Sequence, residues 1–329
     1  MSLQKPPALK AETPASPQSA GAPARSQWGP HLRLLGMAVL WGASWPAGRI
    51  LALNMPPLAA SGLRFALAVM LLLPWLYFSG GLGALKNWSL KTWLGMIAAG
   101  ATGVFGYSSF FLTGLQYLPA GKAALLITLN PVVTLLLAVW LFKERINKVI
   151  ALGMLLAALG AVVVISHGAP LQLLSGTVGV GELLILGCVA CWVCYTLIGR
   201  AMLAGVDALA ATTVTAIVGG IMLLTASLVV EGSNGIVSAF HASREAWFAM
   251  FFIAFGSTSI AYAWYFAGVK ALGAGAASGY ITLVPVVGVI LSALLLGESI
   301  DSSMWVGGAM AIAGTAVMNF GRTLPLSTK

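Results

Sequence analysis

The chain has 329 residues, of which 59% are hydrophobic and only 8% are charged. A soluble domain carries about 25% charged residues, so this composition excludes an ordinary soluble protein. The formal net charge of +9 does not indicate nucleic-acid binding, because the cations lie between apolar runs of membrane-spanning length.

The first 28 residues are rich in Pro, Ala and Ser and lack an apolar period, which predicts a disordered tail. Apolar runs follow, and we expect an all-α integral membrane protein with ten transmembrane helices. The expected spans are 33–53, 58–78, 93–115, 119–142, 148–166, 178–199, 208–230, 247–269, 273–296 and 303–320. The longest connections between the spans are 79–92, 167–177 and 231–246, and residues 321–329 are expected to form a second, cytoplasmic tail.

The distribution of cations predicts the orientation. An even number of spans places both termini on one side of the membrane. If that side is the cytoplasm, 13 of the 17 Lys and Arg residues lie inside, and only Arg49, Arg64, Lys122 and Arg244 lie at or near the outer side. Since cytoplasmic loops carry an excess of cations, we expect a multi-pass protein of the inner (cell) membrane with both termini in the cytoplasm.

Part of the chain occurs twice. Residues 114–163, shifted by 154 positions, align without a gap on residues 268–317, and 19 of the 50 positions are identical. The identities include polar and special residues: Thr128 with Thr282, Pro131 with Pro285, Glu144 with Glu298, Gly153 with Gly307, and Gly160 with Gly314. We therefore expect two repeats, 33–166 and 178–320. Because each has five spans, an odd number, the second must be inverted relative to the first.

Short motifs add a resemblance to this plan. The first span contains Trp41-Gly42-Ala43-Ser44-Trp45 and the second contains Leu63-Arg64-Phe65. In each repeat a helix with a central proline is followed by a turn containing glutamate. In these features the chain resembles the EamA family of the drug/metabolite transporter (DMT) superfamily, although Val193 stands where a glycine is expected after Trp192. The resemblance implies a ten-helix carrier of small metabolites, often an exporter, and no particular substrate.

The two prolines are candidate gating residues. Pro131 and Pro285 lie near the middle of their spans, and each removes the hydrogen bond to the carbonyl four residues earlier. Freed backbone groups are tolerated in a bilayer only beside protein or a water-lined cavity. Thr128 and Thr282 share the helical face of these prolines and are candidate substrate contacts. The alternative is a purely structural kink.

Deep aromatic residues are candidates for lining a substrate pocket: Trp41, Tyr107, Trp192, Tyr195, Tyr262 and Tyr280. A buried Tyr hydroxyl needs a hydrogen-bond partner, which favours the interior of the bundle. The alternative is anchoring at the membrane interface, which we expect for Trp75, Tyr77, Trp93 and Trp247.

Few ionisable residues lie within the predicted spans. Arg64 is a candidate for coupling to an ion, or it fixes a helix contact or extends to the interface. Glu182 is the candidate proton carrier, or an interfacial residue whose charge suits a helix N-terminus. Lys122 could meet a substrate carboxylate or face the outer interface.

No cofactor or metal site is expected. Cys188, Cys191 and Cys194 spread over about 120° of one helix, so their thiolates would not converge on one ion. The histidines, His31, His167 and His241, lie in loops or at helix ends.

The sequence thus predicts a secondary active transporter, and not an enzyme, that exports small neutral or zwitterionic metabolites such as amino acids, or drugs, by alternating access. The alternatives are an integral membrane enzyme, or a channel or lipid-linked substrate flippase. The expected partners are a small-molecule substrate and the lipid bilayer, with no nucleic acid. The sequence leaves open whether the protein forms a homodimer.

Overall fold

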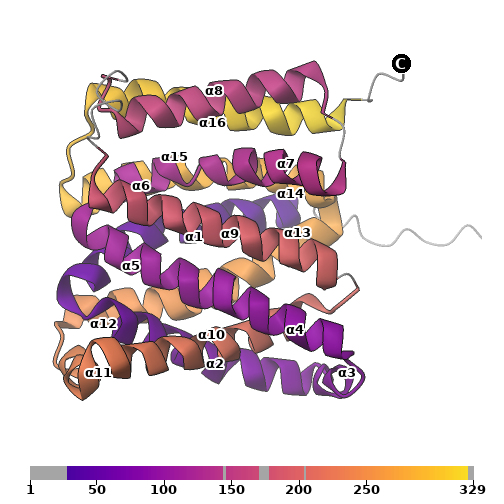
Figure 1. The fold of residues 1–329 in the computed structure, drawn as a ribbon, viewed down its shortest axis with the longest axis vertical. Helices are drawn as coiled ribbons and strands as arrows, with labels where there is room; N and C mark the ends of the chain where they lie inside the picture. The colour runs from indigo at the N-terminus through magenta and orange to yellow at the C-terminus, as the bar shows by residue number, and fades with distance from the viewer. Residues whose placement is uncertain (1–27, 144–145, 170–177, 204, 325–329) are drawn as a thin grey trace, which may run out of the picture.

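A computed structural model describes residues 28–143, 146–169, 178–203 and 205–324, and this part of the chain is helical without a β-strand (Figure 1). The predicted all-α membrane class is confirmed. Among the described residues, nine helices are long and apolar enough to cross a membrane. Helix α1 (Trp28–Asn54) has 27 residues but is not one of the nine, so the expected count of ten is not established.

The uninterrupted long helices follow the expected spans closely. Besides α1 they are α2 (Pro57–Phe78), α8 (Lys148–Ile165), α9 (Val180–Met202), α10 (Ala208–Val230) and α16 (Ser302–Thr323). Two of the longest connections contain short helices, α3 (Leu82–Leu85) and α11 (Gly232–Phe240). Helix α11 forms because its Gly235 and Ala239, one turn apart, are buried against the bundle. The predicted tail 1–28, apart from Trp28, and the residues Glu144 and Arg145 lie outside the described residues.

Four spans are interrupted, in two equivalent pairs. The third and eighth spans each contain a π-helical segment, and the fourth and ninth each break near the proline. Their parts are α4 (Leu90–Ala99), η1 (Gly100–Gly106) and α5 (Tyr107–Tyr117); α12 (Arg244–Phe251), η3 (Phe252–Ile260) and α13 (Ala261–Leu272); α6 (Ala120–Leu126) and α7 (Leu129–Phe142); and α14 (Ala274–Ile281) and α15 (Leu283–Leu296). Wide π turns within an α-helix are frequent at functional sites.

The fifth helices of the two repeats, α8 and α16, pack against each other at one edge of the bundle (Figure 1). A Cβ added at Gly160 would lie 2.4 Å from the backbone nitrogen of Ala311, and one added at Gly314 would lie 2.3 Å from that of Ala157. The duplicated glycines therefore let the two backbones approach closely, which is the usual basis of helix association in membranes.

Contacts at the two ends of this helix pair are related by the repeat. Asn147 caps α8 and donates from Nδ2 to the carbonyl of Gly321, 2.7 Å away. Asp301, the equivalent of Asn147, caps α16 and lies 3.7 Å from the ring of His167, the equivalent of Gly321. Such a crosswise pairing is what an inverted repeat produces. We call the end of the bundle with Asn147 and Gly321 the terminal end, and the opposite end the Lys122 end.

The turns after α7 and α15 also match. Lys143 and Gly297 occupy equivalent positions and both adopt the left-handed conformation, with φ values of 54° and 65°. A helix commonly stops in this way, and glycine adopts it without strain. Gly297 meets this conformational demand without strain, whereas Lys143 meets it at a steric cost.

Candidate functional site

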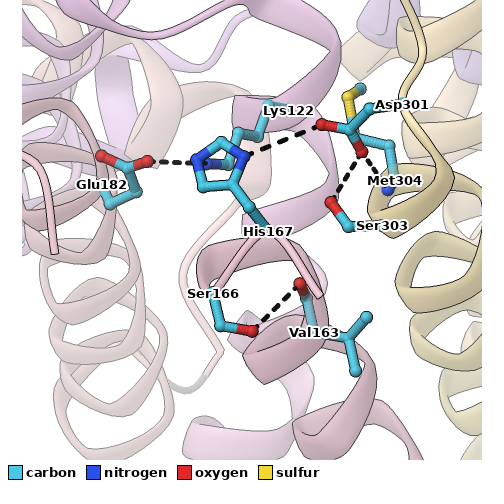
Figure 2. A network of polar contacts seen from close by, with 8 residues as sticks. All are labelled: Lys122, Val163, Ser166, His167, Glu182, Asp301, Ser303 and Met304. Atoms are coloured by element: carbon cyan, nitrogen blue, oxygen red, sulfur yellow. Dashed lines mark hydrogen bonds and ion pairs between the residues drawn. The ribbon is translucent and has the colours of Figure 1, made fainter. Parts of the chain in front are cut away.

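A buried ion pair lies at the Lys122 end. Lys122 lies in α6, and its Nζ atom is 2.7 Å from Oε1 of Glu182 in the first turn of α9 (Figure 2). The two side chains are only 4% and 10% exposed. The interfacial interpretation of Lys122 was wrong, because the side chain is buried and its ammonium group meets a carboxylate of its own chain. The pair joins the fourth span of the first repeat to the first span of the second.

His167 extends this pair toward α16. The Lys122 ammonium group donates to Nε2 of His167 at 2.8 Å. An ammonium group has only donors, so Nε2 is the acceptor and the ring proton sits on Nδ1. Figure 2 shows that the ring faces Asp301, whose Oδ2 lies 3.7 Å from Nδ1. We call Lys122, Glu182, His167 and Asp301 the Lys122 network.

The backbone places His167 for this role. Helix α8 ends at Ile165, and His167 follows with a φ of 51°, the left-handed region that a non-glycine residue rarely adopts. The next N–H, of Gly168, returns to the carbonyl of Val163 at 3.0 Å and completes the helix cap. The left-handed backbone conformation of His167 costs about 1–2 kcal/mol, and it places the ring in the Lys122 network.

Asp301 is held as an anion at the start of α16. Its Oδ1 accepts hydrogen bonds from the Met304 N–H at 2.8 Å and the Ser303 hydroxyl at 2.6 Å. Burial raises the pKa of Asp301, but these hydrogen bonds outweigh it and leave the pKa below its ordinary value.

Two further glutamates cap helices of the opposite repeat. Glu298 accepts from the N–H groups of Ala120 and Gly121, at 2.8 and 2.9 Å, where α6 begins. Glu231 accepts from the N–H groups of Leu58 and Ala59, both at 2.8 Å, where α2 begins. A carboxylate suits a helix N-terminus because the unpaired N–H groups carry partial positive charge. Both contacts tie one repeat to the other.

Deep aromatic side chains form two rows. In the first, Trp41 packs edge-on against Tyr262 with ring centroids 5.2 Å apart, and its Nε1 donates to the carbonyl of Ser257 at 3.0 Å. In the second, Tyr107 stacks on Phe111 and packs against Trp192, which in turn packs against Tyr195. The side chains come from both repeats, as expected for a pocket between them.

Arg64 lies near these rows and is almost fully buried, with 7% exposure. Its Nη2 donates to the hydroxyl of Ser108 at 2.7 Å, and its guanidinium group lies 4.4 Å from the ring centroid of Phe65. Its Nε atom is buried without a hydrogen-bond partner. Tyr107 and Tyr262 lie within electrostatic range of the guanidinium group.

Near the proline breaks, backbone and threonine groups form hydrogen bonds within their own helices. The N–H of Asn130 donates to the carbonyl of Ile127 at 2.9 Å, so a tighter turn satisfies the group that Pro131 leaves free. The hydroxyls of Thr128 and Thr282 each donate, at 2.6 Å, to the carbonyl three residues earlier. The side chains expected to meet substrate therefore bond to their own helices in this state.

Two cavities open away from the Lys122 network. One of about 460 Å³ lies at the terminal end between α7, α8, α9 and α16 and is lined by Thr134, Ala138, Thr196, Arg200 and Arg322. The other, of about 200 Å³, lies between α2, α10 and α13 and is lined by Leu72, Trp75, Thr212 and Tyr262.

Comparisons with known proteins decide the family. The model of the EamA-like transporter family matches residues 29–166 and 179–320. The chain belongs to the EamA family. It is 30% identical to the uncharacterized transporter YyaM of Bacillus subtilis (strain 168), over 86% of this chain and 91% of that protein. It is 26% identical to a probable amino-acid metabolite efflux pump of Salmonella typhimurium, over 87% of this chain and 93% of the pump. A crystal structure at 20% identity, covering 89% of this chain and 96% of its own, superposes with a TM-score of 0.61 and shows the same fold.

In this EamA-family chain, the structure brings together some of the residues singled out in the sequence. Trp41 meets Tyr262, and Tyr107, Trp192 and Tyr195 form a row. Tyr280 stands apart, because its hydroxyl lies 2.6 Å from Nδ1 of His31.

Sequence reasoning missed His167, Asp301, Ser108 and the capping roles of Glu231 and Glu298. Of these roles, only that of Glu298 had a signal in the sequence, which is its match with Glu144 in the repeat. The other contacts join residues far apart in sequence and leave no local pattern. Within the described residues no group of three or more His, Cys, Asp or Glu side chains could hold a metal ion.

Proposed function

We propose that the protein is a secondary active transporter, and not an enzyme, that exports small neutral or zwitterionic metabolites such as amino acids, or drugs, by alternating access. The observation that carries the proposal is the pair of proline-broken helices at equivalent positions of the two repeats. The two ends of the bundle also differ, since the ion pair lies at one end and the larger of the two cavities described opens at the other. Two related proteins, each named as a probable amino-acid metabolite efflux pump, support the substrate class.

The ends of the bundle differ in a way that suits one access state. The Lys122 network and the Glu298 cap hold the Lys122 end closed. The 460 Å³ cavity opens at the terminal end. Pro131 and Pro285 each break the regular i→i−4 hydrogen bonding of a helix, so α6–α7 and α14–α15 are where bending would exchange the closed end. The two states then differ little in free energy, as alternating access requires.

The orientation that we propose places both termini in the cytoplasm, because the cations concentrate on that side. The terminal cavity then receives substrate from the cytoplasm, and the Lys122 end faces outward. Single cysteines replacing Lys143 and Gly297 should then react with impermeant reagents from opposite sides of an inner membrane. Reaction of both from one side would exclude the inverted topology.

The substrate contacts that we propose are Trp41, Tyr107, Trp192, Tyr195, Tyr262 and Tyr280, with Thr128 and Thr282 joining after the helices bend. For coupling we propose Glu182, if export is driven by protons. Protonation of Glu182 removes its ion pair with Lys122, so proton binding and opening of the Lys122 end are linked. Glu182→Gln should abolish the stimulation of transport by a proton gradient. Full gradient-dependent transport by this variant would remove Glu182 from the coupling role.

Counterflow in proteoliposomes tests the function itself. Vesicles loaded with an unlabelled amino acid or drug should accumulate the labelled compound transiently if the protein is a carrier. Leakage without acceleration by preloading would indicate a channel. Chemical conversion of the compound during the assay would support the enzyme alternative.

A further inference from the structure

We propose that Arg64 is the binding site for a carboxylate of the transported molecule, which narrows the substrates to compounds such as amino acids that carry one. The inference rests on the proposed carrier function. It adds the residue and the chemical group through which the carrier recognises its substrate.

The first argument compares two buried cations. Lys122 and Arg64 are 3% and 7% exposed. Lys122 has a carboxylate 2.7 Å away, whereas Arg64 forms no ion pair with any carboxylate of the described residues. A buried charge without a partner is strongly unfavourable in a protein interior, and more so in a membrane. A ligand that brings a negative charge removes this penalty, so the site favours an anionic group.

The second argument is the unused hydrogen-bonding capacity of Arg64. A guanidinium group has five N–H donors arranged as a planar fork. Here Nη2 binds the Ser108 hydroxyl, and Nε has no partner although it is buried. Arginine recognises carboxylates through pairs of parallel N–H groups, and the unpartnered Nε supplies one donor for such a pair.

A purely structural role explains the arrangement less well. Helices α2 and α5 are already joined by the Ser61 hydroxyl, which donates to the carbonyl of Ser108 at 3.3 Å. A neutral amide at position 64 could also donate to the Ser108 hydroxyl without placing a charge in the membrane. The charge therefore needs a reason beyond the helix contact.

Arg64 does not face either cavity in this state. The 200 Å³ cavity is lined by Leu72, Trp75, Asp207 and Tyr262 among others, and Arg64 is not one of its lining residues. Leu72 lies eight residues, about 12 Å, along α2 from Arg64. A substrate carboxylate would therefore reach Arg64 only after the helices move between access states.

The test compares matched ligands on the purified full-length protein. The probes are the L-amino acids and their C-terminal amides, each at equal concentration, with thermal unfolding as the readout. At least one acid should raise the melting temperature while its amide does not. Arg64→Gln should lower the apparent affinity for that acid at least tenfold. Arg49→Gln, which changes another partly buried arginine, should keep the discrimination between acid and amide.

A second measurement separates this role from a structural one. Without ligand, Arg64→Leu should melt at the same temperature as the wild type or higher, because it removes an unpaired buried charge. A structural role predicts a lower melting temperature for this variant. Unchanged acid binding by Arg64→Gln, or equal binding of acid and amide by the wild type, would overturn the proposal.

Counterflow distinguishes failure of this inference from failure of the carrier function. If the wild type exchanges an amine such as phenylethylamine but no carboxylate compound, the carrier stands and the role of Arg64 falls. If no amino acid, amine or drug shows counterflow, the proposed function itself fails.

Discussion

Breaking the ion pair between Lys122 and Glu182 should both destabilise the protein and open one end of it. At 2.7 Å, opposite charges attract by about 6 kcal/mol at an effective dielectric constant of about 20, before the cost of removing them from water. Both side chains are at most 10% exposed, so screening by solvent is small. Removing one partner of such a buried pair costs about 3–5 kcal/mol, because the other charge stays buried without a partner.

A double-mutant cycle measures this effect. Glu182→Gln and Lys122→Met should each lower the free energy of unfolding in mixed micelles by about 3–5 kcal/mol, and the double variant should lose much less than their sum. Lys148→Met, which removes an exposed lysine, serves as the control and should change stability by less than about 0.5 kcal/mol. A coupling energy near zero would refute the reasoning from the buried pair.

The structural consequence has its own assay. Ser166 is buried beside the network, with 5% exposure. In a chain whose three cysteines are replaced, a cysteine at position 166 should react slowly with an impermeant maleimide. Glu182→Gln should accelerate the reaction at least several-fold. An unchanged rate would mean that the ion pair stabilises the bundle without closing this end.

Three other perturbations test the architecture. Gly160→Leu should prevent α8 and α16 from packing and lower the unfolding free energy by about 1–3 kcal/mol or more. The control Gly199→Leu, at a site with open space, should change the unfolding free energy little, and thermal unfolding compares the two variants. Pro131→Ala and Pro285→Ala should fold, since alanine favours a helix. Each variant should transport slowly in vesicles, and the two should be trapped in opposite access states. Wild-type transport rates in both would mean that the prolines only shape the resting bundle. Glu298→Ala should cost about 1–2 kcal/mol in unfolding free energy by exposing the start of α6, and an unchanged value would show that the cap contributes nothing.

The helices were predictable because a membrane restricts what can cross it. A spanning segment must be apolar and long, and it must satisfy its own backbone, so hydropathy alone placed the span 208–230 where α10 runs. The π-helical segments were not predictable. Their sequences, such as Gly100–Gly106, are as apolar and small as those of the neighbouring turns, and the wider turn results from packing.

The repeat predicted more than hydropathy did. Because Gly153 and Gly160 match Gly307 and Gly314, the same close contact appears twice between α8 and α16. The breaks at the two prolines also follow from the repeat and from the chemistry of proline. The tighter turn that satisfies Ile127 did not follow, because it depends on local geometry that no residue pattern specifies.

The charged residues show where such reasoning ends. Lys122 and Arg64 give the same signal in the sequence, a cation within an apolar span, and for each a functional role stood against a position at the membrane interface. Their roles differ only through partners from other helices. Glu182, which is 60 residues from Lys122, neutralises one cation, while Ser108 offers the other a neutral hydroxyl. A charge with its counter-ion in place has a stable closed arrangement to break, which suits a gate. A charge without one has an arrangement still to complete, which suits a site where a ligand brings the missing charge and leaves with it.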